Sequence, residues 1–222
     1  MRSSAPFFGI ARIKTAFDLA SLSVVTATPL EYRVACAELP GVNVVNAGIG
    51  LSNLGQSLAG TAISCGLAGG LTDRLTTGTV VIPDVIGRAD GTALQCDPEL
   101  TQRLRASADS LGVPYSSEAL VTTSAIARGE ERQRWAQRGF VAADMESALL
   151  QAPRVAAVRV ILDLPSRELH AAWVRPASVI FHPRAWLELP WLAREAPRCA
   201  RLAARVIAKA LNQSGHCRGS SD

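Results

Sequence analysis

The sequence has few aromatic residues, a modest share of charged residues and no long hydrophobic run. Of its 222 residues, 5% are aromatic, 19% are charged and 48% are hydrophobic. Without a stretch of about 18 apolar residues, the sequence predicts no membrane-spanning helix. This composition also excludes an intrinsically disordered chain, a collagen and a coiled coil. The length fits one large domain with a sizeable buried core.

The five cysteines form no paired motif. No two of them are separated by two residues, and an odd number cannot pair completely, so neither a disulfide framework nor a zinc site is favoured. We expect free thiols in a reducing cytosol, and neither a metal nor an organic cofactor. The cysteines are Cys36, Cys65, Cys96, Cys199 and Cys217.

Charge is distributed unevenly along the chain. The whole sequence carries 23 basic and 19 acidic residues, whereas residues 151–222 carry 11 basic and 5 acidic ones. This basic part fits contact with nucleic acid, an anionic membrane or a phosphorylated ligand, and equally the solvated side of a terminal helix.

The first 22 residues lack the uninterrupted apolar centre of a secretory signal, because Lys14 and Asp18 interrupt it. We therefore expect a cytoplasmic protein. Its predicted organisation is a loose N-terminal leader over 1–22, a single domain over 23–212 and a flexible tail over 213–222.

Short β-branched runs alternate with helix-compatible segments from Ser23 onward, which is typical of an α/β domain. Several runs are continuously apolar, as in a sheet covered on both faces. The predicted strands are Ser23–Thr28, Val42–Asn46, Ala62–Cys65, Thr79–Pro83, Ala119–Thr123, Gly139–Ala143 and Val155–Leu162. The predicted helices are Leu30–Glu38, Leu51–Thr61, Glu99–Leu111, Glu130–Gln137, Met145–Gln151 and a long one near Ala193–Leu211.

Acidic residues and glycine-rich stretches follow several of these strands. Glu31 follows the first predicted strand, and Glu146 and Asp163 follow the last two. Glycine-rich stretches at 48–50 and 66–70 follow the second and third strands. Because ligands bind outside the carboxyl ends of strands in open α/β sheets, these features predict one pocket.

Three familiar motifs are absent or incomplete. The sequence has no GxxxxGK[ST] phosphate loop and no GxSxG elbow, and its three histidines all lie late in the chain. Ordinary P-loop nucleotide hydrolysis and Ser-His-Asp hydrolysis are therefore disfavoured. The stretch Gly48–Asn53 has two of the three glycines of a dinucleotide fingerprint and asparagine in the third place, which makes that interpretation weak.

With P-loop and Ser-His-Asp hydrolysis disfavoured, the chemistry that the sequence still allows depends on carboxylates. Cleaving a sugar from a base passes through a cationic sugar and needs an acid, an anion near the sugar hydroxyls and a base for the incoming water. Glu31, Glu146 and Asp163 could supply these functions. From spacing alone a structural role stays open, because Glu31 and Glu146 also suit first helical turns and Asp163 suits a turn before Pro165.

Four stretches resemble, in family order, the signature segments of the nucleoside phosphorylase/nucleosidase superfamily. The most specific is Val141–Ala148, which resembles Val-x-x-Asp-Met-Glu-Ser-Ala. Ser64–Val81 resembles the Gly-x-Ala-Gly-Gly and Gly-Asp-Val-Val region, Val44–Gly50 the Gly-Ile-Gly loop, and Arg159–Asp163 the late Arg-x-Ile-Ser-Asp. The resemblance implies a three-layer α/β/α fold with a mixed, twisted central sheet.

The opening stretch Val25–Glu31 is most similar to the superfamily's hydrolases of 5′-substituted purine nucleosides. These are the methylthioadenosine/S-adenosylhomocysteine nucleosidases and the futalosine hydrolases. The Gly-Asp-Pro-x-Arg phosphate loop of the purine phosphorylases is absent. The segment Trp186–Leu211, rich in arginine, leucine and tryptophan, is broadly similar to the hopanoid-associated phosphorylase-like group.

The resemblance also implies roles for individual residues. Glu31 would be the general base that orients water, and Arg159 would help to hold that water. Glu146 would accept both ribose hydroxyls, and Asp163 would hold or deliver a proton at the purine N7. Such an acid works best with a raised pKa, which an apolar flank produces. The remaining implied binding residues are Met145 beside the ribose, Gly48 in the upstream loop, and Leu67, Ala68, Gly69 and Ile126 near the base.

Four departures from the family pattern affect the base pocket. Leu162 stands where the family has serine before the late aspartate, and Leu67 where many nucleosidases have serine. Ile126 replaces an aromatic residue, which predicts weaker stacking on the base. The interval from Glu146 to Asp163 is short, and Pro153 would end the intervening helix early.

The C-terminal segment Trp186–Leu211 has apolar residues near helical spacing with arginines between them. Pro190 and Pro197 predict that no single continuous helix covers it. A helix covering the sheet, a membrane-surface helix and a dimer contact are three interpretations of this segment.

We therefore expect an enzyme that hydrolyses the N-glycosidic bond of a 5′-substituted purine nucleoside, with adenine as the expected base. The alternatives are a phosphorylase using Arg33, Arg88 or Arg159 for phosphate, release of adenine from an adenosylated lipid in the hopanoid pathway, and a catalytically weak nucleoside-binding protein. The expected partners are a nucleoside, phosphate in the phosphorylase alternative, a peripheral membrane contact through residues 186–211 and a second copy in a homodimer, but no nucleic acid.

Overall fold

A computed structural model describes residues 21–174, 179 and 181–212. The predicted tail and nearly all of the predicted leader lie outside these residues. The first strand begins at Leu22, the last residue of the predicted leader.

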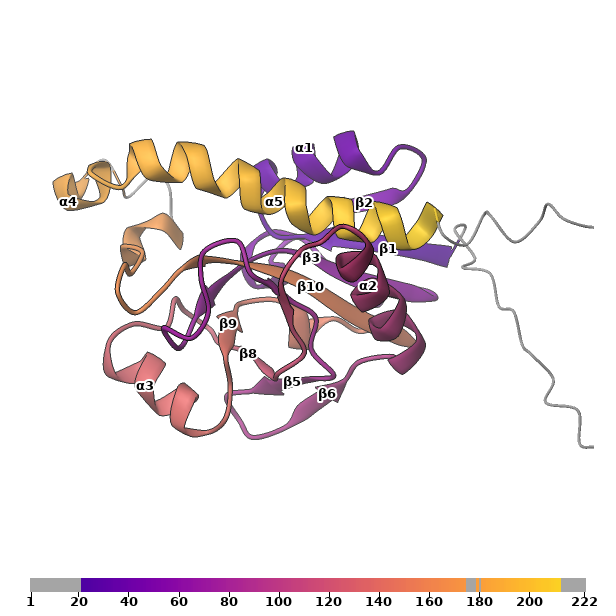
Figure 1. The fold of residues 1–222 in the computed structure, drawn as a ribbon, viewed down its shortest axis with the longest axis horizontal. Coiled ribbons are helices and arrows are strands. Elements are labelled where there is room, and N and C mark those ends of the chain that lie inside the picture. The colour runs from indigo at the N-terminus through magenta and orange to yellow at the C-terminus, as the bar shows by residue number, and fades with distance from the viewer. Residues whose placement is uncertain (1–20, 175–178, 180, 213–222) are drawn as a thin grey trace, which may run out of the picture.

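Ten strands of the described chain form one mixed sheet (Figure 1). In chain order they are β1 (Leu22–Thr26), β2 (Asn43–Asn46), β3 (Thr61–Gly70), β4 (Val80–Val81), β5 (Val85–Arg88), β6 (Ala93–Gln95), β7 (Tyr115–Ser116), β8 (Leu120–Thr122), β9 (Ala142–Asp144) and β10 (Arg154–Asp163).

The long strand β3 lies at the centre of the sheet. Along one edge it pairs in parallel with β10, from Thr61 opposite Arg154 to Gly69 opposite Asp163. Along the other edge its first half pairs in parallel with β1, and its last two residues pair antiparallel with β9. The carboxyl ends of β1, β3 and β10 therefore point the same way, and β9 joins β3 at that end.

Helices cover both faces of the sheet, as Figure 1 shows. Helices α1 (Pro29–Glu38), α2 (Pro98–Ser110) and α5 (Leu189–Asn212) pack together on one face. Helix α3 (Glu130–Gln137) packs through Trp135 against Val121 and Ala143 on the other face. The predicted α/β fold with a mixed central sheet is confirmed.

The alternation of β10 separates a packing face from a polar face. Ala156, Val158, Val160 and Leu162 belong to the core cluster under α5. Arg159 and Asp163 lie at the alternate positions, because successive side chains of a strand point to opposite faces. The strand therefore carries Arg159 and Asp163 on the face away from α5, whereas its third ionisable group, Arg154, begins the strand and pairs with Asp97 and Glu99.

Two predicted helices are wrong. Residues 51–61 form no helix beyond the single 3₁₀ turn η2 (Ile49–Leu51), because Gly48, Gly50 and Leu51 adopt positive φ angles. The predicted helix Met145–Gln151 is only the 3₁₀ turn η3 (Ser147–Leu149). Its N-terminal side is held in a non-helical conformation at Glu146, where φ is −131°.

The predicted interruption of the C-terminal helix is also wrong. Helix α5 runs through Pro197, and Pro190 lies in its first turn, where a missing N–H costs nothing. Pro197 leaves the carbonyl of Ala193 without its helical partner, and that residue is exposed to water. The apolar face of α5, from Ala196 to Ala210, is buried on the sheet, so this helix covers the core.

A hairpin of β5 and β6 was not predicted from the sequence. The two strands pair antiparallel from Val85 opposite Gln95 to Gly87 opposite Ala93. The turn contains Asp90-Gly91 with Gly91 at φ +88°, a strong hairpin signal. Strand β6 is short and mostly exposed, so its residues lack the apolar pattern of a strand.

We expect the Ile207→Ala substitution to lower the free energy of unfolding by about 2–5 kcal/mol, because it leaves a cavity between α5 and the sheet. Ile207 is fully buried. The exposed Lys209→Ala on the same helix should change stability by no more than about 0.5 kcal/mol. Urea unfolding measures both, and equal stabilities of the two variants would contradict the packing described.

Candidate functional site

A cavity of about 170 Å³ opens at the carboxyl ends of β1, β3 and β10. Three acidic side chains from distant parts of the sequence line it: Glu31, Glu146 and Asp163. Each of them is no more than 6% exposed. The three carboxylates that the sequence singled out therefore face one buried space.

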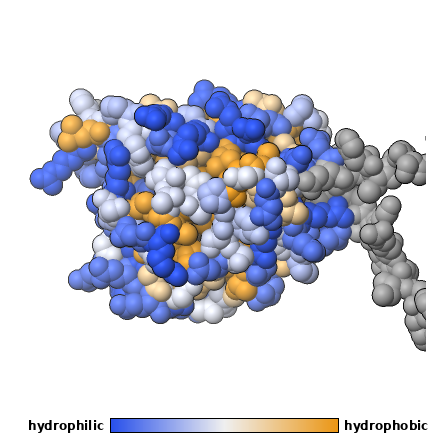
Figure 2. All heavy atoms as spheres, in the orientation of Figure 1, coloured by the Kyte–Doolittle hydropathy of each residue, from blue (hydrophilic) through white to orange (hydrophobic). Residues whose placement is uncertain are grey.

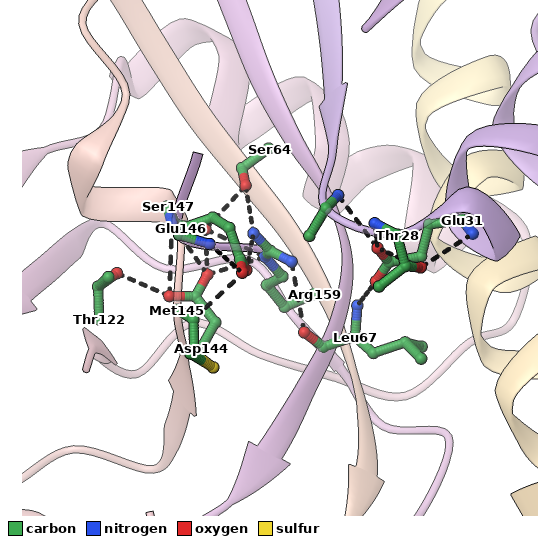
Figure 3. Close-up of polar contacts among 12 residues, drawn as sticks. Thr28, Glu31, Ser64, Leu67, Thr122, Asp144, Met145, Glu146, Ser147 and Arg159 are labelled. Carbon is green, nitrogen blue, oxygen red and sulfur yellow. Dashed lines mark hydrogen bonds and ion pairs between the residues drawn. The ribbon is translucent and has the colours of Figure 1, made fainter. Parts of the chain in front are cut away.

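Glu31 is held at the cavity wall by the start of α1. Thr28 caps this helix in a capping box, in which Glu31 Oε2 accepts hydrogen bonds from the Thr28 backbone N–H (2.8 Å) and hydroxyl (2.9 Å). The other oxygen, Oε1, accepts from the backbone N–H of Leu67 in β3 (2.8 Å; Figure 3). The carboxylate is thus fixed between two elements, and Oε1 retains capacity for one further donor.

Gly66 makes room for this arrangement. A Cβ at that position would lie 2.7 Å from Arg159 Nη1 and closer still to Glu31 Oε1. Any side chain there would displace one of the two groups. A glycine is therefore required at this point of β3, because the Glu31 carboxylate and the Arg159 guanidinium both approach its backbone.

Arg159 lies behind the cavity, with 1% of its surface exposed. Its Nε forms an ion pair with Asp144 (2.9 Å) and its Nη2 forms one with Glu146 (3.3 Å). The guanidinium also donates to Ser64 Oγ, Ser147 Oγ and the Leu67 carbonyl (Figure 3). These contacts join β3, β9, β10 and η3 around one cation.

Glu146 is the second carboxylate that is paired with this cation, and it lines the cavity. Its Oε1 accepts a hydrogen bond from the backbone N–H of Gly50 in η2 (3.2 Å), which brings the upstream glycine loop to the cavity. Burial raises the pKa of Glu146 to about 7, with Asp144 and Glu31 adding to the rise and Arg159 opposing it. This group changes its charge near neutral pH.

Asp163 forms a buried ion pair with Arg132 of α3. Arg132 is 2% exposed, lines the cavity, and also donates to the carbonyls of Ala127 (2.8 Å) and Gly70 (2.7 Å). Asp163 accepts a further hydrogen bond from the Leu169 N–H (3.0 Å). Burial raises the pKa of Asp163, and Arg132 opposes the rise.

Arg132 was not predicted as a site residue, although its spacing from Trp135 in the sequence indicates that it faces the interior. It precedes Trp135 by three residues in α3, and residues at this spacing share a helix face. Because Trp135 packs into the core, Arg132 is carried into the interior beside it.

Most of the other predicted binding residues line the cavity, namely Met145, Leu67, Ala68, Gly69 and Ile126. Gly48 and Arg159 lie outside the lining, and the upstream loop contributes Ile49 instead. Among the described residues, no three histidine, cysteine, aspartate or glutamate side chains lie close enough together to hold a metal ion.

An aromatic residue that the sequence did not assign also reaches the cavity. Trp173, in the 3₁₀ turn η4 (Ala171–Val174), lines the wall beside Leu169. Its indole N–H donates to Glu188 (2.7 Å), which precedes α5. The short interval between Glu146 and Asp163 is compatible with a common cavity because no helix separates η3 from β10.

We expect the Glu146→Gln variant to gain stability relative to the wild type as pH rises from about 4.5 to about 7. In this window the folded wild type retains a proton that the unfolded chain has released, so its free energy of unfolding falls by at most about 1.4 kcal/mol per pH unit. Urea unfolding across this range measures the difference. The exposed Glu130→Gln is the matched control, and a pH-independent difference for Glu146→Gln would contradict the raised pKa.

Comparison with known proteins extends this description. Residues 23–174 match the family model of the phosphorylase superfamily. None of the curated proteins matches the chain. Among the helices of the described residues, none combines the length and apolar character needed to cross a bilayer.

Several solved structures share the fold at low identity. A futalosine hydrolase mutant of Helicobacter pylori is 12% identical, with a TM-score of 0.62 over 86% of this chain and 98% of that one. A 5′-methylthioadenosine/S-adenosylhomocysteine nucleosidase from Neisseria meningitidis, bound to methylthio-immucillin-A, is 15% identical, with a TM-score of 0.62 over 86% and 98%. A putative methylthioadenosine nucleosidase from Weissella paramesenteroides is 17% identical, with a TM-score of 0.61 over 89% and 100%.

The family model covers more than half of the chain, and the solved structures share its mixed sheet across nearly their whole length. The chain belongs to the phosphorylase superfamily, and the expectation of an enzyme acting on nucleosides is confirmed.

Proposed function

We propose that this enzyme hydrolyses the N-glycosidic bond of a 5′-substituted purine nucleoside and releases the free base. The observation that carries the proposal is the convergence of Glu31, Glu146 and Asp163 on one cavity of a phosphorylase-superfamily fold. The solved structures named above include two kinds of hydrolase, which act on methylthioadenosine or S-adenosylhomocysteine and on futalosine.

The three carboxylates suit the three demands of this reaction. The transition state carries positive charge on the sugar, which a carboxylate hydrogen-bonded to the ribose hydroxyls stabilises. Glu146 takes this role, with Met145 as an apolar contact beside the ribose. Glu31 accepts a proton from the attacking water, and Asp163 donates one to N7 of the base, so that the base leaves as a neutral molecule.

The surroundings of Glu31 favour the activation of water. Its Oε1 and Arg159 Nη1 both lie close to Gly66, whose lack of a side chain leaves the two groups near each other. A water molecule in contact with both would donate to the carboxylate and accept from the guanidinium. Arg159 would thus help to hold the attacking water, as predicted, although it lies outside the cavity lining.

The arginines of the described chain favour hydrolysis over phosphorolysis. Of the three arginines considered for phosphate, Arg33 donates to the carbonyl of Pro29 and Arg88 donates to that of Ala148. Arg159 is ion-paired with Asp144 and Glu146 and lies outside the cavity lining. Arg132 does line the cavity, but Asp163 neutralises it.

Adenine as the base, a homodimeric assembly and a cytoplasmic location belong to the same proposal. The resemblance of Val25–Glu31 and Val141–Ala148 to the nucleosidase segments supports adenine and the homodimer, and the location stays a prediction. Trp173 offers the base an aromatic neighbour, because Ile126 stands where the family has an aromatic residue.

The first experiment measures base release from methylthioadenosine, S-adenosylhomocysteine, futalosine, adenosine and inosine, with and without phosphate. We expect release without phosphate, and a fall of about 10²–10⁴-fold in kcat for Glu31→Gln, because general base catalysis is lost. Glutamine has one acceptor oxygen, so it keeps the capping box and gives up the hydrogen bond from the Leu67 N–H; circular dichroism and thermal unfolding check that the fold is retained. Glu38→Gln in the same helix is the matched control.

Three outcomes would overturn this proposal. Release that depends on phosphate and yields a sugar 1-phosphate would identify a phosphorylase. Tight nucleoside binding without release would identify a binding protein. Wild-type turnover by Glu31→Gln would remove that residue from the reaction.

The second experiment tests Asp163 as the acid through its neighbour Arg132. Removing the cation in Arg132→Met should raise the pKa of Asp163 further, because burial then acts unopposed. The alkaline limb of the kcat profile, where the acid loses its proton, should move up by about one to three pH units. Arg132→Lys keeps the charge and should keep the limb, and the exposed Arg134→Met controls for α3. An unmoved limb in Arg132→Met would contradict the acid role.

A further inference from the structure

Five basic residues, spaced three or four apart, lie along the solvent-facing side of α5. We call these residues the basic stripe: Arg194, Arg198, Arg201, Arg205 and Lys209. Their intervals of four, three, four and four residues place them on one helix face. All five are exposed, and the opposite face of the helix is buried on the sheet.

Few acidic groups neutralise the basic stripe. Glu195 forms ion pairs with Arg194 (3.4 Å) and Arg198 (2.7 Å), and Glu38 forms one with Arg201 (3.4 Å). Within the described residues, Arg205 and Lys209 form no ion pair. The stripe therefore presents excess positive charge over about 22 Å of helix.

Exposed hydrophobic side chains gather at the N-terminal end of the same helix. We call this cluster the apolar tip, formed by Phe181 (80% exposed), Trp186 (51%), Leu187 (81%) and Leu189 (46%). In the described chain, Leu149 is the one other large hydrophobic residue with comparable exposure. Figure 2 shows hydrophobic side chains at the left end of the molecule, where Figure 1 places the short helix α4 (Pro183–Trp186).

Two polar side chains near the apolar tip have hydrogen-bond partners within the protein, whereas the apolar side chains of the tip stay exposed. The indole N–H of Trp186 donates to the Val179 carbonyl (2.9 Å), so the ring has its polar atom satisfied. Glu188 turns inward and accepts hydrogen bonds from Trp173 and His170 at the cavity wall. Arg184 adds an exposed cation within the tip.

We propose that the apolar tip and the basic stripe together dock the enzyme on a lipid bilayer that carries anionic headgroups. Aromatic and leucine side chains insert at the boundary between headgroups and acyl chains, and arginine and lysine bind the anionic surface. Nucleic acid would use the stripe but leave the tip exposed. A second copy of this chain would cover the tip but would not account for the basic stripe. An anionic bilayer complements both features.

The test is sedimentation of the full chain with vesicles of phosphatidylcholine alone or mixed with phosphatidylglycerol. We expect sedimentation with the mixed vesicles, weakening as salt is raised. Reversing charge in Arg205→Glu/Lys209→Glu should lower the partition coefficient about tenfold or more. Trp186→Ser/Leu187→Ser should abolish the part of the binding that survives high salt.

Matched controls separate docking from general changes of charge and apolarity. Arg134→Glu, on the exposed face of α3, and Leu149→Ser, outside the apolar tip, should sediment like the wild type. All variants should keep the circular dichroism and thermal unfolding of the wild type. Because sedimentation requires no turnover, its result is independent of the proposed hydrolysis.

The proposal would be overturned by three results. The first is equal or absent sedimentation with the two kinds of vesicle. The second is loss of binding in the control variants as large as in the stripe and tip variants. The third is a tip variant that sediments unchanged while a single-stranded oligonucleotide displaces the protein from the vesicles, which would assign the stripe to nucleic acid.

Discussion

The ion pairs between the buried guanidinium of Arg159 and the carboxylates of Asp144 and Glu146 are the contacts on which the site depends. A buried carboxylate without a partner costs several kcal/mol, and this cation offsets that cost for two of them. The hydroxyls of Ser64 and Ser147 occupy further guanidinium donors. Because these partners come from β3, β9 and η3, the cation also fixes how the strands meet.

The position of Arg159 follows from the alternation of β10. Residues at even positions of this strand pack under α5, so residues at odd positions face the cavity side. A shift of one residue in register would bury Arg159 among the apolar residues of α5 and turn Val158 toward Glu146. The burial of the apolar face of α5 on the sheet therefore also determines where Arg159 and Asp163 of β10 lie.

The sequence predicted the elements whose pattern is local. The helix Glu130–Gln137 was found from its helix-compatible residues and the strand at Val155–Leu162 from its nearly continuous apolar run, and the structure contains both. The predicted helix at 51–61 was wrong because Gly48, Gly50 and Leu51 adopt positive φ angles, and the one at 145–151 was wrong because long-range contacts decide its conformation. Glu146 is drawn out of a helical conformation by Arg159 and Gly50, and neither partner is visible in the local pattern.

Some residues of the cavity could likewise be predicted from the sequence, and others could not. Glu31, Glu146 and Asp163 were singled out because they follow strands, and strand ends meet at one edge of the sheet. Arg132 and Trp173 come from segments without such a signal and reach the cavity through tertiary packing. The helix face shared by Arg132 and Trp135 was a usable signal for the first. No local pattern would have placed Trp173, which depends on its hydrogen bond to Glu188.

The environment of Asp163 contains two opposing effects that would act at different stages of the proposed proton transfer. Burial raises the pKa and favours the protonated form, which a general acid needs before the reaction. Arg132 and the Leu169 N–H stabilise the carboxylate, which forms once the proton has moved to the base. An acid with burial alone would hold its proton too tightly, and one with the cation alone would have lost it before the substrate arrives. Efficient transfer requires a pKa near the working pH, and the combination of burial with one buried cation moves the pKa of this carboxyl in that direction.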